Sequence, residues 1–121
     1  MDIAAEVGII RGQFAQSRRL LTAIGDDTRQ AIILTLMESG CVGMRVGGIT
    51  QRTHLSRPAV SHHLKILVEA GIVSLTPQGT KNFYRLYLGE KWDVLVSLIG
   101  RIEGLRQREM PTADTDKKEL V

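Results

Sequence analysis

Two adjacent histidines, His62 and His63, lie in the segment LSRPAVSHHLKILVEAGIV and are flanked by Ser61 and Lys65. Neighbouring histidines suggest a metal site, a proton-transfer pair or a polar surface that binds a partner. Consecutive residues of a helix point about 100° apart, whereas helical histidines that share one metal ion are spaced i, i+4. The pair is therefore a poor chelate, and the choice between the other two interpretations depends on the elements around it.

The segment itself reads as a helix of about four turns. Ser56 is placed to cap it, and Pro58 lies in the first turn, where its missing N–H does no harm. Gly71 is the expected stop signal. Apolar residues follow the i, i+4, i+7 spacing of one buried face: Val60, Leu64 and Leu67.

The opposite side of this helix is polar and rich in hydrogen-bond donors. Ser61, His62 and Lys65 face outward, with Arg57 at the flank, and such groups suit base edges and phosphates. His63 lies near the border of the buried face. For it, two interpretations stay open: a packed, hydrogen-bonded histidine or a contact to DNA.

The remaining elements predict a fold that is mainly α with a small β-hairpin (α+β). A 121-residue chain makes one domain, expected over residues 1–110 and followed by a disordered polar tail at 111–121. Ile32, Ile33, Leu36 and Met37 form the expected buried stripe of the second helix. Helices are expected at 3–24, 27–40, 48–55 and 90–109, a short strand at 44–46, and hairpin strands at 72–77 and 83–88.

A short helix, a tight turn, a second helix and a basic hairpin follow one another in the order of a winged helix–turn–helix module. In such a module the second helix enters the DNA major groove. Lys81 and Arg85, at or after the hairpin tip, are expected to contact the DNA backbone. The alternative is a solvated turn with two charges that protect a strand edge.

Charge and composition agree with a polyanionic partner. Six Lys and Arg residues lie between positions 45 and 87, where Glu69 is the single acidic residue, although the whole chain carries only +3. No apolar run reaches the roughly 18 residues that a membrane helix needs. Asp2 and Glu6 lie where a signal peptide would carry positive charge. The sequence therefore predicts a cytoplasmic protein, and a lone Cys41 agrees with a reducing compartment.

Three stretches together, DDTRQAIILTLMESG, LSRPAVSHHLKILVEAGIV and GTKNFYRLYL, resemble the ArsR-type family of bacterial winged-helix repressors. The resemblance covers roughly residues 18 to 105. It implies a homodimer that is joined through helices at both chain ends and binds an inverted-repeat operator. Many members release DNA when a metal ion or another inducer binds. His62 stands where the family commonly has arginine, and Arg57 where it often has glutamine.

The family's metal motifs are incomplete in this chain. The stretch that matches the Cys-Val-Cys sensor motif reads Cys41-Val42-Gly43, so the second thiolate is missing. The C-terminal helix offers carboxylates but no histidine for the family's second metal site. We therefore expect no metal and no cofactor. Cys41 is expected to be a buried or half-buried small residue, with a redox role left open.

The last helix carries more apolar residues than one small core needs. Val94, Leu98 and Leu105 widen its apolar stripe, so a shared interface between two chains is favoured over packing within the monomer. The expected interface residues are Phe14, Leu21, Trp92, Leu95, Ile99 and Ile102.

The sequence thus predicts a homodimeric DNA-binding repressor. The alternative is a protein-interaction module that keeps the winged-helix scaffold without specific DNA binding. An enzyme is not expected, because the chain shows no nucleophile–base pair, phosphate loop or paired acids. A small-molecule inducer is possible but is not identified by any motif. The expected DNA contacts are Ser56, Arg57, Ser61, His62, His63, Lys65, Lys81 and Arg85.

Overall fold

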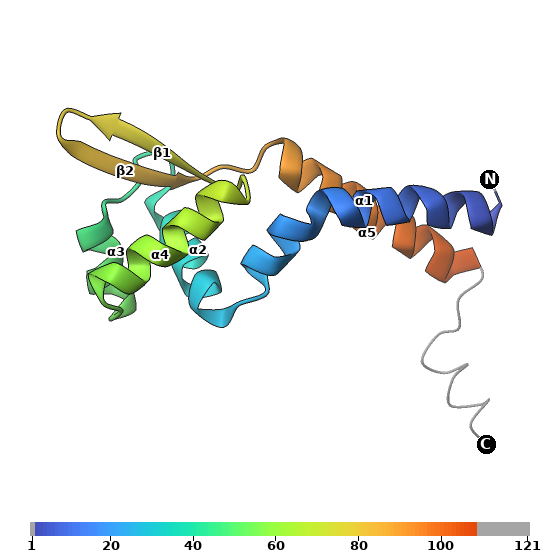
Figure 1. The fold of residues 1–121 in the computed structure, drawn as a ribbon, viewed down its shortest axis with the longest axis horizontal. Coiled ribbons are helices and arrows are strands. Elements are labelled where there is room, and N and C mark those ends of the chain that lie inside the picture. Colours follow the sequence, from blue (N-terminus) through green and yellow to red (C-terminus); the bar gives the residue numbers. More distant parts are fainter. Residues whose placement is uncertain (1, 109–121) are drawn as a thin grey trace, which may run out of the picture.

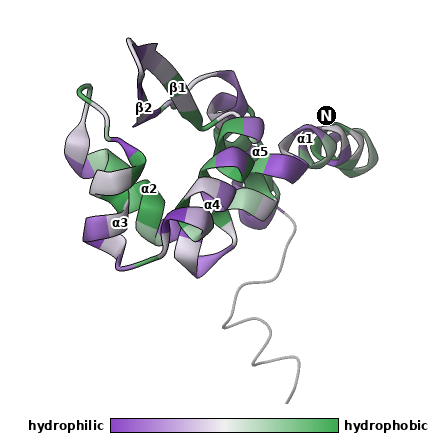
Figure 2. Cartoon of the chain, turned by 60° about the vertical axis from the view of Figure 1, so that its left-hand side comes forward, coloured by the Kyte–Doolittle hydropathy of each residue, from purple (hydrophilic) through white to green (hydrophobic). Residues whose placement is uncertain are grey.

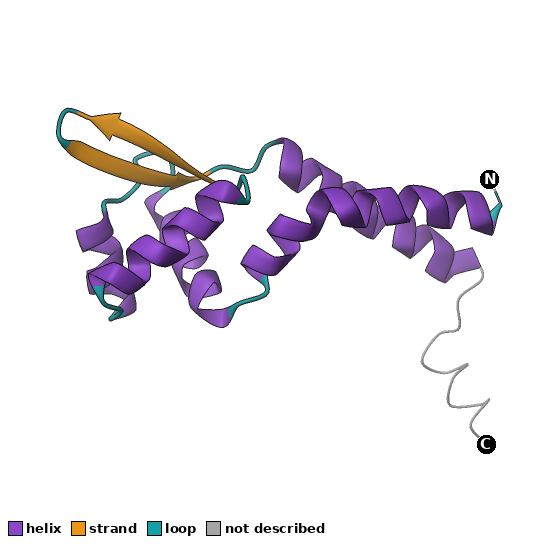
Figure 3. Cartoon of the chain, in the orientation of Figure 1, coloured by secondary structure: helices purple, strands orange, loops and turns teal. Residues whose placement is uncertain are grey.

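The computed structural model describes residues 2–108, and the tail expected at 111–121 lies outside them. Five helices and one two-stranded hairpin make up this part of the chain, in agreement with the expected fold class (Figures 1 and 3). The elements in chain order are α1 (Ile3–Ile24), α2 (Asp27–Ser39), α3 (Val46–Thr53), α4 (Arg57–Glu69), β1 (Val73–Gln78), β2 (Lys81–Leu86) and α5 (Glu90–Arg108).

Helices α2, α3 and α4 and the hairpin enclose one hydrophobic core, which we call the winged core. In Figure 2, α2 is coloured largely as hydrophobic, because it lies in the middle of these elements. Met37 departs from the expected buried stripe of α2: it is 50% exposed and lines an open hollow with Leu86 and Trp92. The fully buried side chains of the winged core are Ile32, Leu36, Ile49, Val60, Leu64 and Leu67.

The helix boundaries follow local capping chemistry. The carboxylate of Asp26 accepts a 2.9 Å hydrogen bond from the backbone N–H of Arg29 and so caps α2. The Ser56 hydroxyl accepts a 3.2 Å bond from the N–H of Ala59 and caps α4 in the same way. After α4, Gly71 adopts a φ of +85°, which reverses the chain into β1. The Ser56 cap and the glycine stop were expected from the sequence.

The hairpin and the segment before α3 differ in detail from the expectation. The strands pair from Val73↔Leu86 to Gln78↔Lys81, so β2 starts two residues early and the turn is only Gly79–Thr80. Gly79, with a φ of +65°, supplies the positive φ that such a two-residue turn requires. The expected strand at 44–46 is reduced to one bridge between Met44 and Tyr84, because α3 already begins at Val46.

Helices α1 and α5 pack side by side, antiparallel, and project away from the winged core as an arm (Figure 1). Gln13 donates to the Ser97 hydroxyl at 2.8 Å, and Arg101 forms a 2.9 Å ion pair with Glu6. Both contacts join α1 to α5. Within residues 2–108, no helix combines the length and the apolar character that crossing a membrane requires.

Candidate nucleic-acid interface

Helices α3 and α4 are joined by only three residues, 54–56. His54 ends α3 in the left-handed conformation, with a φ of +60°, and its N–H bonds to the Thr50 carbonyl at 2.9 Å. Ser56 then starts α4 at once, with Pro58 in its first turn. This tight connection is the turn of a helix–turn–helix unit, so α4 occupies the position of a recognition helix.

The outer face of α4 is polar and open to solvent. Ser61, His62 and Lys65 are exposed, whereas Val60 and Leu64, on the other side, are fully buried. Arg57 and Ser56 are exposed as well, at the start of the helix. The helix therefore presents donors outward in the arrangement that reading base edges requires.

A cationic cleft lies beside the start of α4, between α3 and the hairpin tip. The cleft holds about 340 Å³ and is lined by Arg45, Arg57 and Lys81, together with Gly47 and residues 80–82 of the turn. Within residues 2–108, none of these three cations has an acidic partner. Arg45 lies at the N-cap of α3 without a side-chain cap, so the first N–H groups of α3 are free to bind an anion.

Arg45 was counted in the basic stretch but not named among the expected contacts. The cleft forms because Arg57 crosses the first turn of α3: a Cβ added to Gly47 would lie 3.0 Å from an Arg57 guanidinium nitrogen. The glycine pair at the start of α3 was the available signal, since glycine permits close approach.

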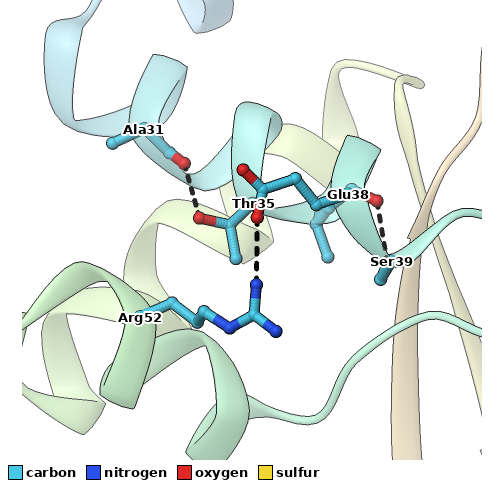
Figure 4. Close-up of polar contacts among 6 residues, drawn as sticks. Ala31, Thr35, Glu38, Ser39 and Arg52 are labelled. Atoms are coloured by element: carbon cyan, nitrogen blue, oxygen red, sulfur yellow. Dashed lines mark hydrogen bonds and ion pairs between the residues drawn. The ribbon is translucent and has the colours of Figure 1, made fainter.

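Two other basic residues of the stretch are placed away from this surface. Arg52 pairs with Glu38 of α2 at 2.9 Å, beside Thr35, whose hydroxyl donates to the Ala31 carbonyl (Figure 4). Arg85 is half-buried, and its buried Nε has no hydrogen-bond partner among residues 2–108. It lies with Cys41 beside the loop after α2, so the structure does not bring it together with Lys81.

His63 has surroundings different from those of His62. Its ring is half-buried, and its Nδ1 lies 3.3 Å from an Arg29 guanidinium nitrogen of α2. The two histidine rings are 5.5 Å apart in an edge-to-face arrangement. Of the two interpretations left open for His63, the packed and hydrogen-bonded histidine fits this environment. His62, in contrast, points outward.

Cys41 corrects one expectation, because its side chain is exposed rather than buried or half-buried. Cys41 lies in the loop 40–43, just after the end of α2. Within the described residues, no group of three or more His, Cys, Asp or Glu side chains is arranged to hold a metal ion. That no metal binds stays a prediction.

Comparison with known proteins agrees with this geometry. The family model described as "Bacterial regulatory protein, arsR family" matches residues 26–74, which run from the cap of α2 into β1. An uncharacterised HTH-type transcriptional regulator of Methanocaldococcus jannaschii is 39% identical over 72 residues, covering 60% of this chain and 79% of the relative. This chain belongs to the ArsR family.

Two further similarities agree with this assignment, and one of them extends into the arm. The transcriptional repressor SdpR of Bacillus subtilis is 39% identical over 64 residues, which are 53% of this chain and 68% of SdpR. The solved structure of an ArsR-like transcriptional regulator from Rhodococcus sp. RHA1 superimposes with a TM-score of 0.73 at 24% identity. It covers 91% of this chain and 96% of its own, so the ArsR-like winged-helix fold extends beyond the matched motif.

Proposed function

We propose that this ArsR-family regulator represses transcription by occupying an inverted-repeat operator as a homodimer. The observation that carries the proposal is the exposed donor face of α4 beside an unpaired cationic cleft. A protein-interaction surface would not need three unpaired cations around exposed helix N–H groups. The phosphates of a DNA duplex would bind the cations and also accept hydrogen bonds from the helix N–H groups.

The residues divide into two roles. Ser61, His62 and Lys65 face the bases of the major groove from α4. Arg57 and Lys81, together with the newly identified Arg45, bind phosphates on the flank and so supply affinity with little sequence preference. Arg85 stays a predicted backbone contact, though its half-buried position makes it the weakest of the set.

The exposed apolar face of the arm supports dimerisation. Phe14, Ile99 and Ile102 are 46%, 59% and 41% exposed, and Val7 and Val96 lie open in the same arm. Leu95, in contrast, is buried within the protomer, while Leu21 and Trp92 are partly buried against its core. A second arm would cover the exposed set and place the two α4 helices about 34 Å apart.

The proposed mechanism is occupancy of DNA, with no side chain doing covalent chemistry and no metal or cofactor at the family's usual positions. Because the partner is DNA, we place the protein in the cytoplasm. An organic inducer remains compatible with this proposal, and the operator assay below provides the means to screen for one.

The experiment is an anisotropy titration with duplexes selected from a random pool, against scrambled duplexes, at several salt concentrations. We expect a complex of two chains per duplex. His62→Ala should reduce the discrimination between selected and scrambled DNA. Lys81→Ala should weaken both alike and lower the slope of log affinity against log salt by about 1.

Lys91→Ala is the matched control, because it removes the same charge at an exposed position on α5. It should leave both affinities close to those of the unchanged protein. If the unchanged protein bound selected and scrambled duplexes equally, the repressor proposal would be wrong and the interaction-module alternative would take its place.

A further inference from the structure

The side chain of Arg29, in the first turns of α2, joins three helices. Its Nε donates to the Ala23 carbonyl at 2.7 Å, and its Nη2 donates to the Thr22 carbonyl at 3.1 Å. Its Nη1 lies 3.3 Å from Nδ1 of His63. One planar group thus connects the last turn of α1, which belongs to the arm, to the middle of α4, which carries the DNA-facing residues.

The chemistry of the two partners fixes the protonation state of His63 in this contact. A guanidinium has donors only and keeps its charge at every relevant pH. His63 must therefore accept through Nδ1, which makes its ring neutral with the proton on Nε2. A protonated ring would carry an N–H on both nitrogens and would place a second positive charge against Arg29.

We propose that Arg29 is a positioning residue for DNA binding, which holds α4 at a fixed angle to α1 only while His63 is neutral. The inference rests on the proposed function. In a dimer that is joined through the arms, the connection between α1 and α4 sets the separation of the two recognition helices, which must match the spacing of successive half-sites. Loss of the contact would leave each winged core folded but would misplace it on the operator.

Three charged or titratable groups surround His63. Arg29 and Asp26 approach from the start of α2, and His62 approaches along α4 itself, while α1 contributes the carbonyls that hold Arg29. The Asp26 carboxylate attracts a protonated His63, whereas Arg29 repels it. His62 faces outward, so its protonation adds positive charge toward DNA. Protonation of the two adjacent histidines would therefore change operator affinity in opposite directions.

The test measures affinity for the selected operator duplex by anisotropy at pH 8. Arg29→Ala should weaken specific binding about tenfold or more, because it removes the contact with His63 together with both hydrogen bonds to α1. Arg18→Ala is the control, since it removes the same charge from an exposed position of α1, and it should stay within about twofold.

Two substitutions of His63 separate positioning from general stability. His63→Asn keeps an acceptor near the place of Nδ1 but cannot be protonated, so it should match the unchanged protein at pH 8. His63→Leu removes the acceptor and should weaken binding about tenfold. At pH 5.5 the unchanged protein should bind more weakly than His63→Asn. Because both proteins contain His62, the ratio of their affinities is independent of the contribution of His62.

Two results would overturn the inference. One is a further tenfold loss on adding His63→Leu to Arg29→Ala, because additive losses mean that His63 acts on DNA by itself. The other is an Nδ1–H tautomer of His63 in ¹⁵N spectra of the unchanged protein at pH 8. The spectra are recorded without DNA. They therefore test the contact between Arg29 and His63 even if the protein binds no operator and the proposed function is wrong.

Discussion

The winged core and the arm each contain buried apolar residues, such as Leu36 and Leu98, but the arm also leaves several large apolar side chains open to solvent. Ile32 and Leu64, in the winged core, are fully buried within one chain. Phe14 and Ile99, in the arm, remain 46% and 59% exposed. The hydrophobic effect scales with the area removed from water, so the first set stabilises the monomer and the second favours association. The difference indicates where the protomer is complete and where it requires a partner.

The largest effect is expected from Leu64→Ala in the winged core. It removes buried methyl groups and leaves a cavity, which should lower the free energy of unfolding by about 2–5 kcal/mol. Urea denaturation followed by circular dichroism measures the change. Ile99→Ala is the comparison, and at protein concentrations below dimerisation it should cost well under 1 kcal/mol. Equal losses at the two sites would contradict the distinction between core and arm.

Ile99→Asp sharpens the same comparison at the level of assembly. A symmetric interface would bury the new carboxylate twice, so the dimer dissociation constant should rise by about 100-fold or more. Sedimentation velocity over a concentration series reports the shift. Gln16→Asp adds the same charge on the other helix of the arm, α1, at an exposed position near the end of α4, and should leave the dimer intact. A monomer at all concentrations before any substitution would refute the dimer.

Ser56→Ala probes the winged core at the start of α4. Loss of the hydroxyl that accepts from the Ala59 N–H should reduce the free energy of unfolding by about 1 kcal/mol. Ser56→Asn, which can also cap a helix, should retain most of it. Thermal unfolding of the two variants side by side gives the answer, and identical losses would show that the cap hydrogen bond contributes little.

The smallest effect is expected in the loss of stability of the fold at acidic pH. The backbone N–H of Arg29 is the main group that lowers the pKa of Asp26 below its usual value, and the Arg29 charge adds to it. A carboxyl with a lowered folded-state pKa stabilises the fold above its unfolded pKa, and this stabilisation disappears as pH falls through the folded pKa. Asp26→Asn keeps the cap without the charge.

The unfolding midpoint of Asp26→Asn should therefore fall less steeply than that of the unchanged protein between neutral pH and about pH 3. Parallel curves for the two proteins would mean that the Asp26 charge has no part in folding.

Features encoded by neighbouring residues were predictable from the sequence. The cap at Ser56 and the stop at Gly71 define α4 through contacts within a few residues, and the apolar spacing identified its buried face. The early start of β2 was missed because the turn compresses to Gly79–Thr80, which only pairing across the hairpin determines. The contact of Arg29 with His63 was missed because it joins positions 34 residues apart.

The site was predictable to a similar extent. The outward direction of Ser61, His62 and Lys65 follows from helical periodicity alone. Whether Lys81 and Arg85 face the same surface depends on the twist of the hairpin and on its packing beside the loop after α2, which periodicity does not specify.

Gly47 has a consequence for the genetics of this regulator. A methyl group there would displace only the flexible end of Arg57, at little cost to the fold, and alanine favours a helix over glycine by about 1 kcal/mol. A Gly47→Ala allele would therefore accumulate to normal or higher levels in the cell, while the shift of Arg57 would, on the proposed function, weaken its control of an operator-linked reporter. Screens that select for abundance and screens that select for silencing would favour opposite residues at this one codon.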